Sequence, residues 1–207
     1  MRWSFRACEL PARAGRRLWG LWEASFALLA RIEDPGGPEC FLRLALRRYR
    51  GPRRPLPDGT VLAAGDLVGE LHIKNEYLHA LTAGGGAGRS AALGLRETRK
   101  ALFILAGVLR DDPRFREVKA LVGYTMLHRG TGRVGFAVFD LSRGLRTVIA
   151  LYERWLLVLY HPDGWRHVRR HWRKLVPKLV VLSRGKLMAY RVPEGRGNAH
   201  AHAAGEP

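Results

Sequence analysis

The stretch from Ala64 to His79, AGDLVGELHIKNEYLH, decides how the middle of this chain folds, because a turn, a strand and a helix start follow one another there. Successive side chains of a strand point to opposite faces of its sheet, so Glu70 and His72 share one face. A carboxylate beside an imidazole can orient the ring, fix its tautomer and raise its basicity, which suits a general base or a metal ligand. The alternative is structural, with both side chains on the water-facing side of an antiparallel strand.

A second group of polar side chains lies in and after residues 118–126, an apolar segment that we expect to be an interior strand. Tyr124 belongs to this strand, and His128 and Arg129 follow it. If the strand pairs near that of His72, these groups line one pocket with the first pair. His128 or Arg129 would then stabilise negative charge.

The charge of the chain points to a polyanionic partner. Its 207 residues include 36 Lys and Arg against 18 Asp and Glu, which gives a formal net charge of +18 at pH 7. Such an excess favours acidic lipid headgroups, a phosphorylated substrate or nucleic acid as partners. Because 47% of the residues are hydrophobic, we expect one folded domain over residues 1–192, followed by a disordered tail, 193–207.

The sequence predicts a protein without a membrane span. No segment reaches about 18 uncharged apolar residues, and Glu9 and Pro11 interrupt the apolar core that a signal peptide needs. Cys8 and Cys40 form neither a metal-type spacing nor a disulfide framework. These features predict a cytoplasmic location, with peripheral binding at the inner face of the membrane, and no motif identifies a cofactor or a metal.

Hydrophobic periodicity predicts helices and strands that alternate along the chain. The expected helices span residues 12–33, 93–109 and 145–159, with a short basic helix after Asp163. The expected strands span residues 41–47, 60–62, 67–74, 118–126, 134–139, 179–182 and 187–190. Of these, 118–126 and 134–139 should adjoin across a polar hairpin loop, and the last two should form a closing hairpin. The order predicts a single α+β domain, a mostly antiparallel sheet of five to seven strands covered by three or four helices.

Two segments have alternative interpretations. Residues 12–33 carry a Trp and Phe stripe that suits either docking on the sheet or an anionic membrane surface. The glycine-rich residues 82–90 could cradle a phosphate, but they lack both GxxxxGK[ST] and a GxGxxG pattern after a strand. We therefore expect a mobile connector there.

The helix after Asp163 has the strongest electrostatic footprint of the chain. Trp and Arg alternate along it, which suits a lipid interface or a nucleic-acid backbone, whereas a solvated face on a core helix is the structural alternative. His167 and His171 have the spacing of a metal pair, but their cationic neighbours oppose a metal. The expected ligand-binding residues are Asn75, a helix N-cap by its position, with Arg129, Arg166, Arg169, Arg170, Arg173 and Lys174.

Three stretches together resemble the YkoP-like family of small bacterial proteins. They are residues 65–75 (GDLVGELHIKN), residues 122–130 (VGYTMLHRG), and residues 152–155 (YERW) with 160–162 (YHP). The resemblance spans about residues 18–190. Relatives occur alone or attached to polysaccharide deacetylase domains, which implies a link to cell-envelope carbohydrate metabolism. The chain has no match to the deacetylase motifs, so the resemblance implies an accessory or partner role, and it supplies no catalytic residues to carry over.

The leading hypothesis is an accessory or binding protein of envelope polysaccharide or lipid-linked glycan metabolism. It would bind anionic lipid or a phosphorylated carrier, and a polysaccharide deacetylase or another envelope enzyme would be its protein partner. The main alternative is a transferase or hydrolase whose site combines Glu70, His72, Tyr124 and His128. Non-specific nucleic-acid binding ranks lower, because no helix-turn-helix, RRM or KH signature accompanies the charge.

Overall fold

The computed structural model describes residues 31–74, 77, 87–160 and 163–190, and its centre is a five-stranded sheet. In spatial order the strands are β1 (Leu42–Arg48), β4 (Leu67–Ile73), β5 (Ala120–Thr125), β7 (Lys178–Ser183) and β6 (Ala137–Phe139). Only β4 and β5 pair in parallel, and a small antiparallel sheet joins β2 (Arg54–Pro55) to β3 (Val61–Leu62). The predicted single α+β domain and its strand count are confirmed.

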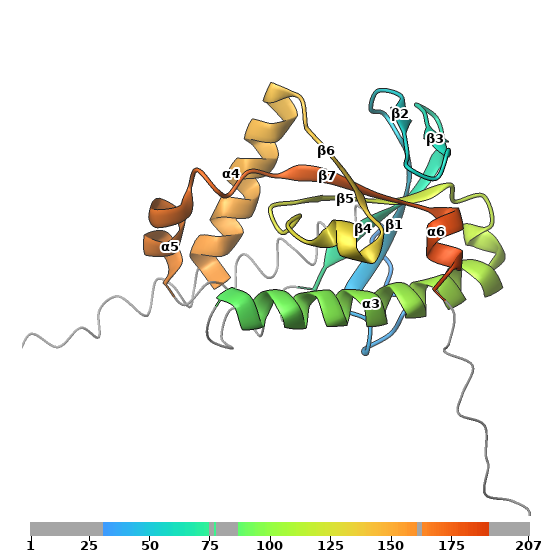
Figure 1. Cartoon of the computed structure of the whole chain (residues 1–207), viewed down its shortest axis with the longest axis horizontal. Coiled ribbons are helices and arrows are strands. Elements are labelled where there is room, and N and C mark those ends of the chain that lie inside the picture. Colours follow the sequence, from blue (N-terminus) through green and yellow to red (C-terminus); the bar gives the residue numbers. More distant parts are fainter. Residues whose placement is uncertain (1–30, 75–76, 78–86, 161–162, 191–207) are drawn as a thin grey trace, which may run out of the picture.

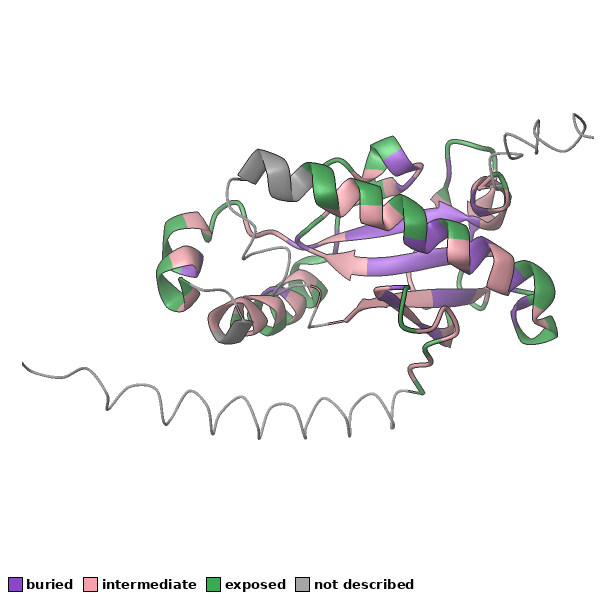
Figure 2. Cartoon of the chain, turned by 90° about the horizontal axis from the view of Figure 1, so that it is seen from below, coloured by how far each residue is buried: buried purple, intermediate pink, exposed green. Residues whose placement is uncertain are grey.

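The first face of the sheet packs against the long helix α3 (Ala87–Asp111), which runs along the bottom of Figure 1. Leu102 and Leu105 of α3 meet Leu44 and Leu121 of the strands in one buried cluster. Helix α6 (Arg184–Met188) and two 3-10 turns, η1 (Pro113–Phe115) and η2 (Thr131–Val134), close the ends of this layer. Burial is deepest along the strands and falls off toward the outer sides of the helices (Figure 2).

The second face is covered by the β2–β3 hairpin and by helix α4 (Arg143–Tyr160). Leu62 of the hairpin and Ile149 of α4 pack with Val68 of β4 and Val122 of β5. A short helix, α5 (Gly164–His171), lies beside α4 at the end of the molecule away from the hairpin (Figure 1). The elements of this layer therefore determine what surrounds Glu70 and His72.

Gly69 leaves room for the leucine side chains of the neighbouring strands. The residue is buried in the middle of β4, and a Cβ built there would lie 2.8 Å from Cδ2 of Leu121 and 3.3 Å from Cδ2 of Leu44. A larger side chain would force these two leucines of the cluster under α3 to move, because protein cores have little free volume.

Two of the expected strand pairings are wrong. Strands β5 and β6 do not adjoin, because β7 lies between them and Leu179 pairs with both Tyr124 and Phe139. Residues 127–133 are consequently a crossover that includes η2, and β6 is an edge strand. The closing hairpin is wrong as well, since β7 leads into α6, where the Ser183 hydroxyl accepts the N–H of Lys186 at 3.2 Å.

The expected helices agree more closely with the structure. Helix α4 matches residues 145–159, and α3 ends at Asp111 ahead of Pro113, as predicted. Helix α3 begins at Ala87, however, so the end of the glycine-rich segment is helical and not a connector. The expected helix over residues 12–33 and the tail from 193 lie almost wholly outside the described residues.

The guanidinium of Arg184 ties the end of β7 to the end of α3. Its Nη2 donates to the carbonyl of Leu109 at 2.7 Å, and its Nη1 donates to the carbonyl of Phe115 at 2.8 Å. The last carbonyls of a helix have no partner within the helix, so this side chain satisfies the Leu109 carbonyl, while the Phe115 carbonyl also accepts the backbone N–H of Val118 at 3.1 Å. The backbone N–H of Arg184 adds a bond to the carbonyl of Lys119 at 2.9 Å.

We predict that Arg184→Met lowers the free energy of unfolding by about 2–4 kcal/mol, since charge-assisted hydrogen bonds are lost and the Leu109 carbonyl stays unpaired. Denaturant unfolding followed by circular dichroism measures the change. Arg116→Met is the control at an exposed arginine nearby, where about 0.5 kcal/mol or less is expected. Similar losses in both variants would contradict the role assigned to Arg184.

Candidate functional site

Glu70 and His72 lie together on the second face of β4, as predicted. Oε1 of Glu70 is 3.4 Å from Nε2 of His72, and each side chain retains 26% of its accessible surface. The antiparallel register places Arg43 of β1 directly opposite His72, and Nε of Arg47 lies 4.0 Å from Oε2 of Glu70. Because β4 is paired on both sides, the two groups sit on an interior strand and not on a free edge.

The two groups do not behave as an ion pair. Burial, followed by the positive charges of Arg47 and Arg43, lowers the pKa of His72 to about 4. Burial also raises the pKa of Glu70, against the opposing effect of Arg47. The predicted increase in the basicity of His72 is therefore wrong, and the imidazole is neutral at neutral pH. Its Nε2 is buried and has no hydrogen-bond partner within the described residues.

Tyr124 and His128 have different surroundings. Burial is the largest cause that raises the pKa of Tyr124, and the negative charge of Glu70 is the next. This phenol therefore shares the environment of Glu70 and His72, the β4 pair. The pKa of His128 is lowered by burial first and then by the charges of Lys178 and Arg129. None of the groups that act on His128 belongs to the β4 pair. The geometry thus associates Tyr124 with Glu70, whereas His128 and Arg129 lie with the start of β7.

The basic residues expected to bind a ligand lie on and after α5. All are exposed: Arg166, Arg169, Arg170, Arg173 and Lys174. Val168 is buried, but Trp165 and Trp172 are 65% and 54% exposed, so the expected apolar side is only partly covered. The side chain of Asp163 makes no N-cap hydrogen bond to α5. The last expected ligand-binding residue, Asn75, lies outside the described residues.

Helix α4 leaves much of its apolar surface uncovered beside α5. Val148 and Leu151 are each 65% exposed and Trp155 is 52% exposed, and their spacing puts them on one side of the helix. Ile149 and Ala150 point inward instead. The sequence predicted a packed amphipathic helix, and the structure adds a second apolar surface that faces outward.

An arginine-lined groove lies between α4 and residues 172–177, the segment that follows α5. Its volume is about 340 Å³. The arginines that line it are Arg146, Arg154 and Arg173, and its apolar residues include Leu151, Trp172 and Val176. Of these arginines, sequence reasoning singled out only Arg173. The other two lie in α4 eight positions apart, just over two helical turns, which puts them near the same side of the helix.

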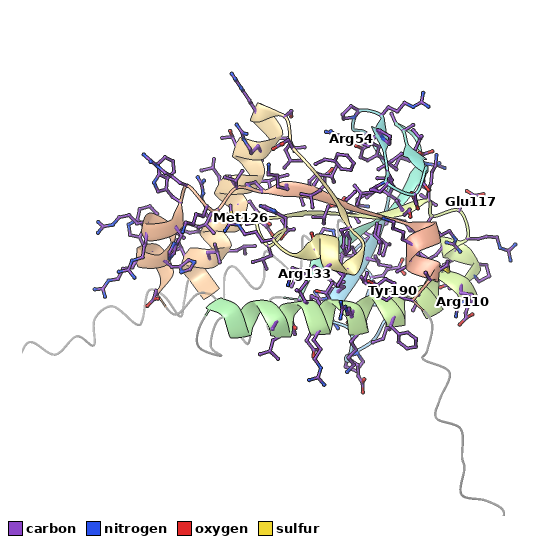
Figure 3. The ribbon with its side chains drawn as sticks, in the orientation of Figure 1. Arg54, Arg110, Glu117, Met126, Arg133 and Tyr190 are labelled. Carbon is purple, nitrogen blue, oxygen red and sulfur yellow. The ribbon has the colours of Figure 1, made fainter. Side chains whose placement is uncertain are left out.

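Glu153 of α4 is another residue whose role the sequence did not indicate. In the sequence it was only a charge that interrupts the apolar run of this helix. It lies on the inner side of α4 and accepts the backbone N–H of Met126, which Figure 3 labels at the end of β5 beside α4. Burial raises the pKa of Glu153 to about 8, and Oε2 has no hydrogen-bond partner among the described residues. The carboxyl group is therefore largely protonated at neutral pH.

Two further searches of the described residues give negative results. No three His, Cys, Asp or Glu side chains in this part of the chain lie close enough together to hold a metal ion. Within the same residues, no helix has both the length and the apolarity that a membrane crossing requires.

Comparison with known proteins gives a family match over most of the chain. The sequence model described as the YkoP domain matches residues 12–191. A Bacillus subtilis (strain 168) protein with the name "Uncharacterized protein YkoP" is 26% identical over 114 residues. The aligned part covers 55% of this chain and 61% of that relative, which is less than two thirds of its length. No solved structure matches.

We predict that the buried Glu153 makes the fold less stable as pH rises from about 5 to about 8. The folded carboxyl group holds its proton up to a pKa of about 8, whereas the unfolded one releases it near 4.5, so raising the pH over this range favours unfolding. Denaturant unfolding of the parent and of Glu153→Gln at a series of pH values measures this. The variant should lose less stability, by up to about 1.4 kcal/mol per pH unit.

The difference between the two proteins isolates Glu153, because both retain His72. The depressed pKa of His72 gives a stability contribution of the opposite sign, which is complete above about 6.5 and is lost as pH falls through about 4. Parallel stability curves for the parent and the variant would show that Glu153 titrates normally.

Proposed function

Because this chain belongs to the YkoP domain family, we propose that it is an accessory or binding protein of bacterial cell-envelope polysaccharide or lipid-linked glycan metabolism. Its partner protein is a polysaccharide deacetylase or another envelope enzyme, as the family resemblance implies. In this proposal the protein works in the cytoplasm and binds peripherally at the inner face of the membrane, through an anionic lipid or a phosphorylated carrier.

The exposed surface formed by α4 and α5 carries this proposal. Two exposed tryptophans, Trp165 and Trp172, flank the arginines of α5, and the apolar side of α4 lies next to them. A lipid interface offers phosphate groups for the guanidinium groups and an apolar layer for the indole rings. A basic surface that served only solubility would have no need of large exposed aromatic side chains.

A second candidate function is catalysis at the β4 pair. The observation that favours it is the contact between a desolvated carboxyl group and a neutral imidazole, since such perturbed groups are concentrated at functional sites. In this proposal Glu70, next to Nε2, orients the ring, His72 accepts a proton from the substrate at its other ring nitrogen, and Tyr124 donates a hydrogen bond. His128 and Arg129 would act only if a substrate extended as far as the start of β7.

The catalytic candidate predicts that His72→Asn and Glu70→Gln each reduce turnover at least about 100-fold, because a positioned general base contributes roughly 10²–10⁴-fold. The assay is a screen of glycan and phosphorylated carrier substrates by mass spectrometry, with Thr98→Ala on α3 as the control variant. Equal turnover by His72→Asn and the parent protein would remove this candidate.

For the membrane proposal, we predict that the full chain sediments with vesicles containing anionic lipid and not with neutral vesicles. Arg166→Glu combined with Arg170→Glu should weaken this binding at least about tenfold, since each basic residue near an anionic surface contributes about 1 kcal/mol. Both arginines lie on the side of α5 opposite buried Val168, so the fold should survive. Sedimentation at two salt concentrations measures the effect.

The matched control reverses two exposed arginines at the other end of the molecule, Arg110 (labelled in Figure 3) and Arg116. This control has the same net charge as the test variant and should still sediment. An equal loss of sedimentation in both variants would show that binding depends only on the net charge of the protein. Stronger binding to duplex DNA, with a steep fall in affinity as salt rises, would favour the nucleic-acid alternative instead.

A further inference from the structure

We propose that the arginine-lined groove between α4 and residues 172–177 holds the phosphate monoester headgroup of an anionic lipid, whose chain lies along the exposed side of α4. This inference rests on the proposed function, because it names the ligand class that the same surface takes. The groove has a volume of about 340 Å³, within the range of small-molecule sites.

The charge of the groove fits a phosphate monoester. Arg146, Arg154 and Arg173 line it, and no Asp or Glu among the described residues does. Arg146 acts on Asp140, but the pKa of Asp140 is lowered chiefly by its bond to Lys178. A phosphate monoester carries about −1.5 to −2 charges at pH 7, and guanidinium groups bind phosphate oxygens in a bidentate manner. Three arginines therefore neutralise one such headgroup.

Arg154 forms the fixed part of this site. Its Nη2 donates to the carbonyls of Trp172 at 3.1 Å and Leu175 at 3.2 Å, which anchors the segment after α5 to α4. Its Nε is buried and has no hydrogen-bond partner among the described residues. A buried donor that lacks a partner is costly, and a small shift of the guanidinium toward a phosphate oxygen in the groove would give it one.

The apolar part of the groove points to a lipid as the source of the phosphate. Leu151 and Trp172 line the groove while remaining largely exposed, and Val148 and Trp155 continue the apolar surface along α4. The guanidinium of Arg173 lies over the Trp172 ring, 5.7 Å from its centre, so one wall combines a cation with an aromatic face. A headgroup between the arginines would thus place its chain on a continuous apolar surface.

The lining disfavours a nucleotide. Arginine reads guanine, whereas the other bases are read mainly by Asn, Gln, Asp, Glu, Ser or Thr side chains. Among the described residues, Thr147 supplies the one hydroxyl that lines the groove, and it already donates to the carbonyl of Arg143 at 2.9 Å. The remaining lining residues are apolar or aromatic, which suits an aliphatic chain.

The test is isothermal titration calorimetry on the full chain with a water-soluble short-chain phosphatidic acid, below its critical micelle concentration. The matched phosphatidylcholine and inorganic phosphate are the comparison ligands. We expect phosphatidic acid to bind at least tenfold more tightly than either. Arg146→Gln combined with Arg173→Gln should weaken binding at least tenfold, whereas Arg110→Gln combined with Arg116→Gln, which removes the same charge at the other end of the molecule, should change it less than threefold.

A second variant keeps the test decisive if the arginine variant does not fold. Leu151→Ser changes an exposed residue, so the fold should persist, and it should weaken binding of phosphatidic acid without affecting inorganic phosphate. Equal binding of inorganic phosphate and phosphatidic acid would overturn the lipid assignment, and equal losses in the two double arginine variants would overturn the groove.

The two proposals can fail separately. If anionic vesicles sediment the protein but soluble phosphatidic acid does not bind, the groove inference is overturned while the membrane proposal stands. If phosphatidic acid binds in the groove but anionic vesicles do not sediment the protein, the groove is supported and the membrane proposal fails.

Discussion

The parallel pairing of β4 with β5 is the constraint on which the rest of the structure depends. Parallel neighbours cannot be joined by a tight turn, so the chain between them must cross over one face of the sheet, and α3 occupies that crossover. Gly69 leaves room for the Leu121 side chain on the face that α3 covers, and Arg184 fixes the end of the crossover by bonding to the carbonyls of Leu109 and Phe115. With α3 filling the first face, the hairpin and α4 are left to cover the second. The partly enclosed polar groups Glu70 and Glu153 both lie in that second layer.

Local features of the fold could be predicted from the sequence, whereas the order of the strands could not. The alternation in residues 67–74 and the helical period in residues 145–159 depend on near neighbours, and both predictions were confirmed. The pairing of residues 137–139 depends on a partner some 40 residues later, β7, which enters between two strands that are consecutive in sequence. Sequential strands are usually neighbours, so the prediction followed the commoner topology. The closing hairpin failed because Ser183 caps a helix where a turn was expected.

The candidate sites divide in the same way. The proximity of Glu70 and His72 follows from the two-residue period of a strand, and it was confirmed. The neutral state of His72 could not be predicted, because it depends on burial and on arginines of β1, a strand more than twenty residues away. The exposure of Trp165 and Trp172 could not be predicted either, since an apolar stripe has the same sequence pattern whether or not another element covers it. The groove could not be predicted either, because it depends on how α4 and residues 172–177 lie relative to each other.

The central claim is that the surface formed by α4 and α5 binds anionic lipid. Hydrogen–deuterium exchange of the full chain, with and without vesicles that contain anionic lipid, tests it most directly, because the method locates the contact along the backbone. The account predicts slower exchange in peptides from residues 143–160 and 163–177 and unchanged exchange in α3. Protection of α3 with none in α4 and α5, or no change anywhere, would contradict it.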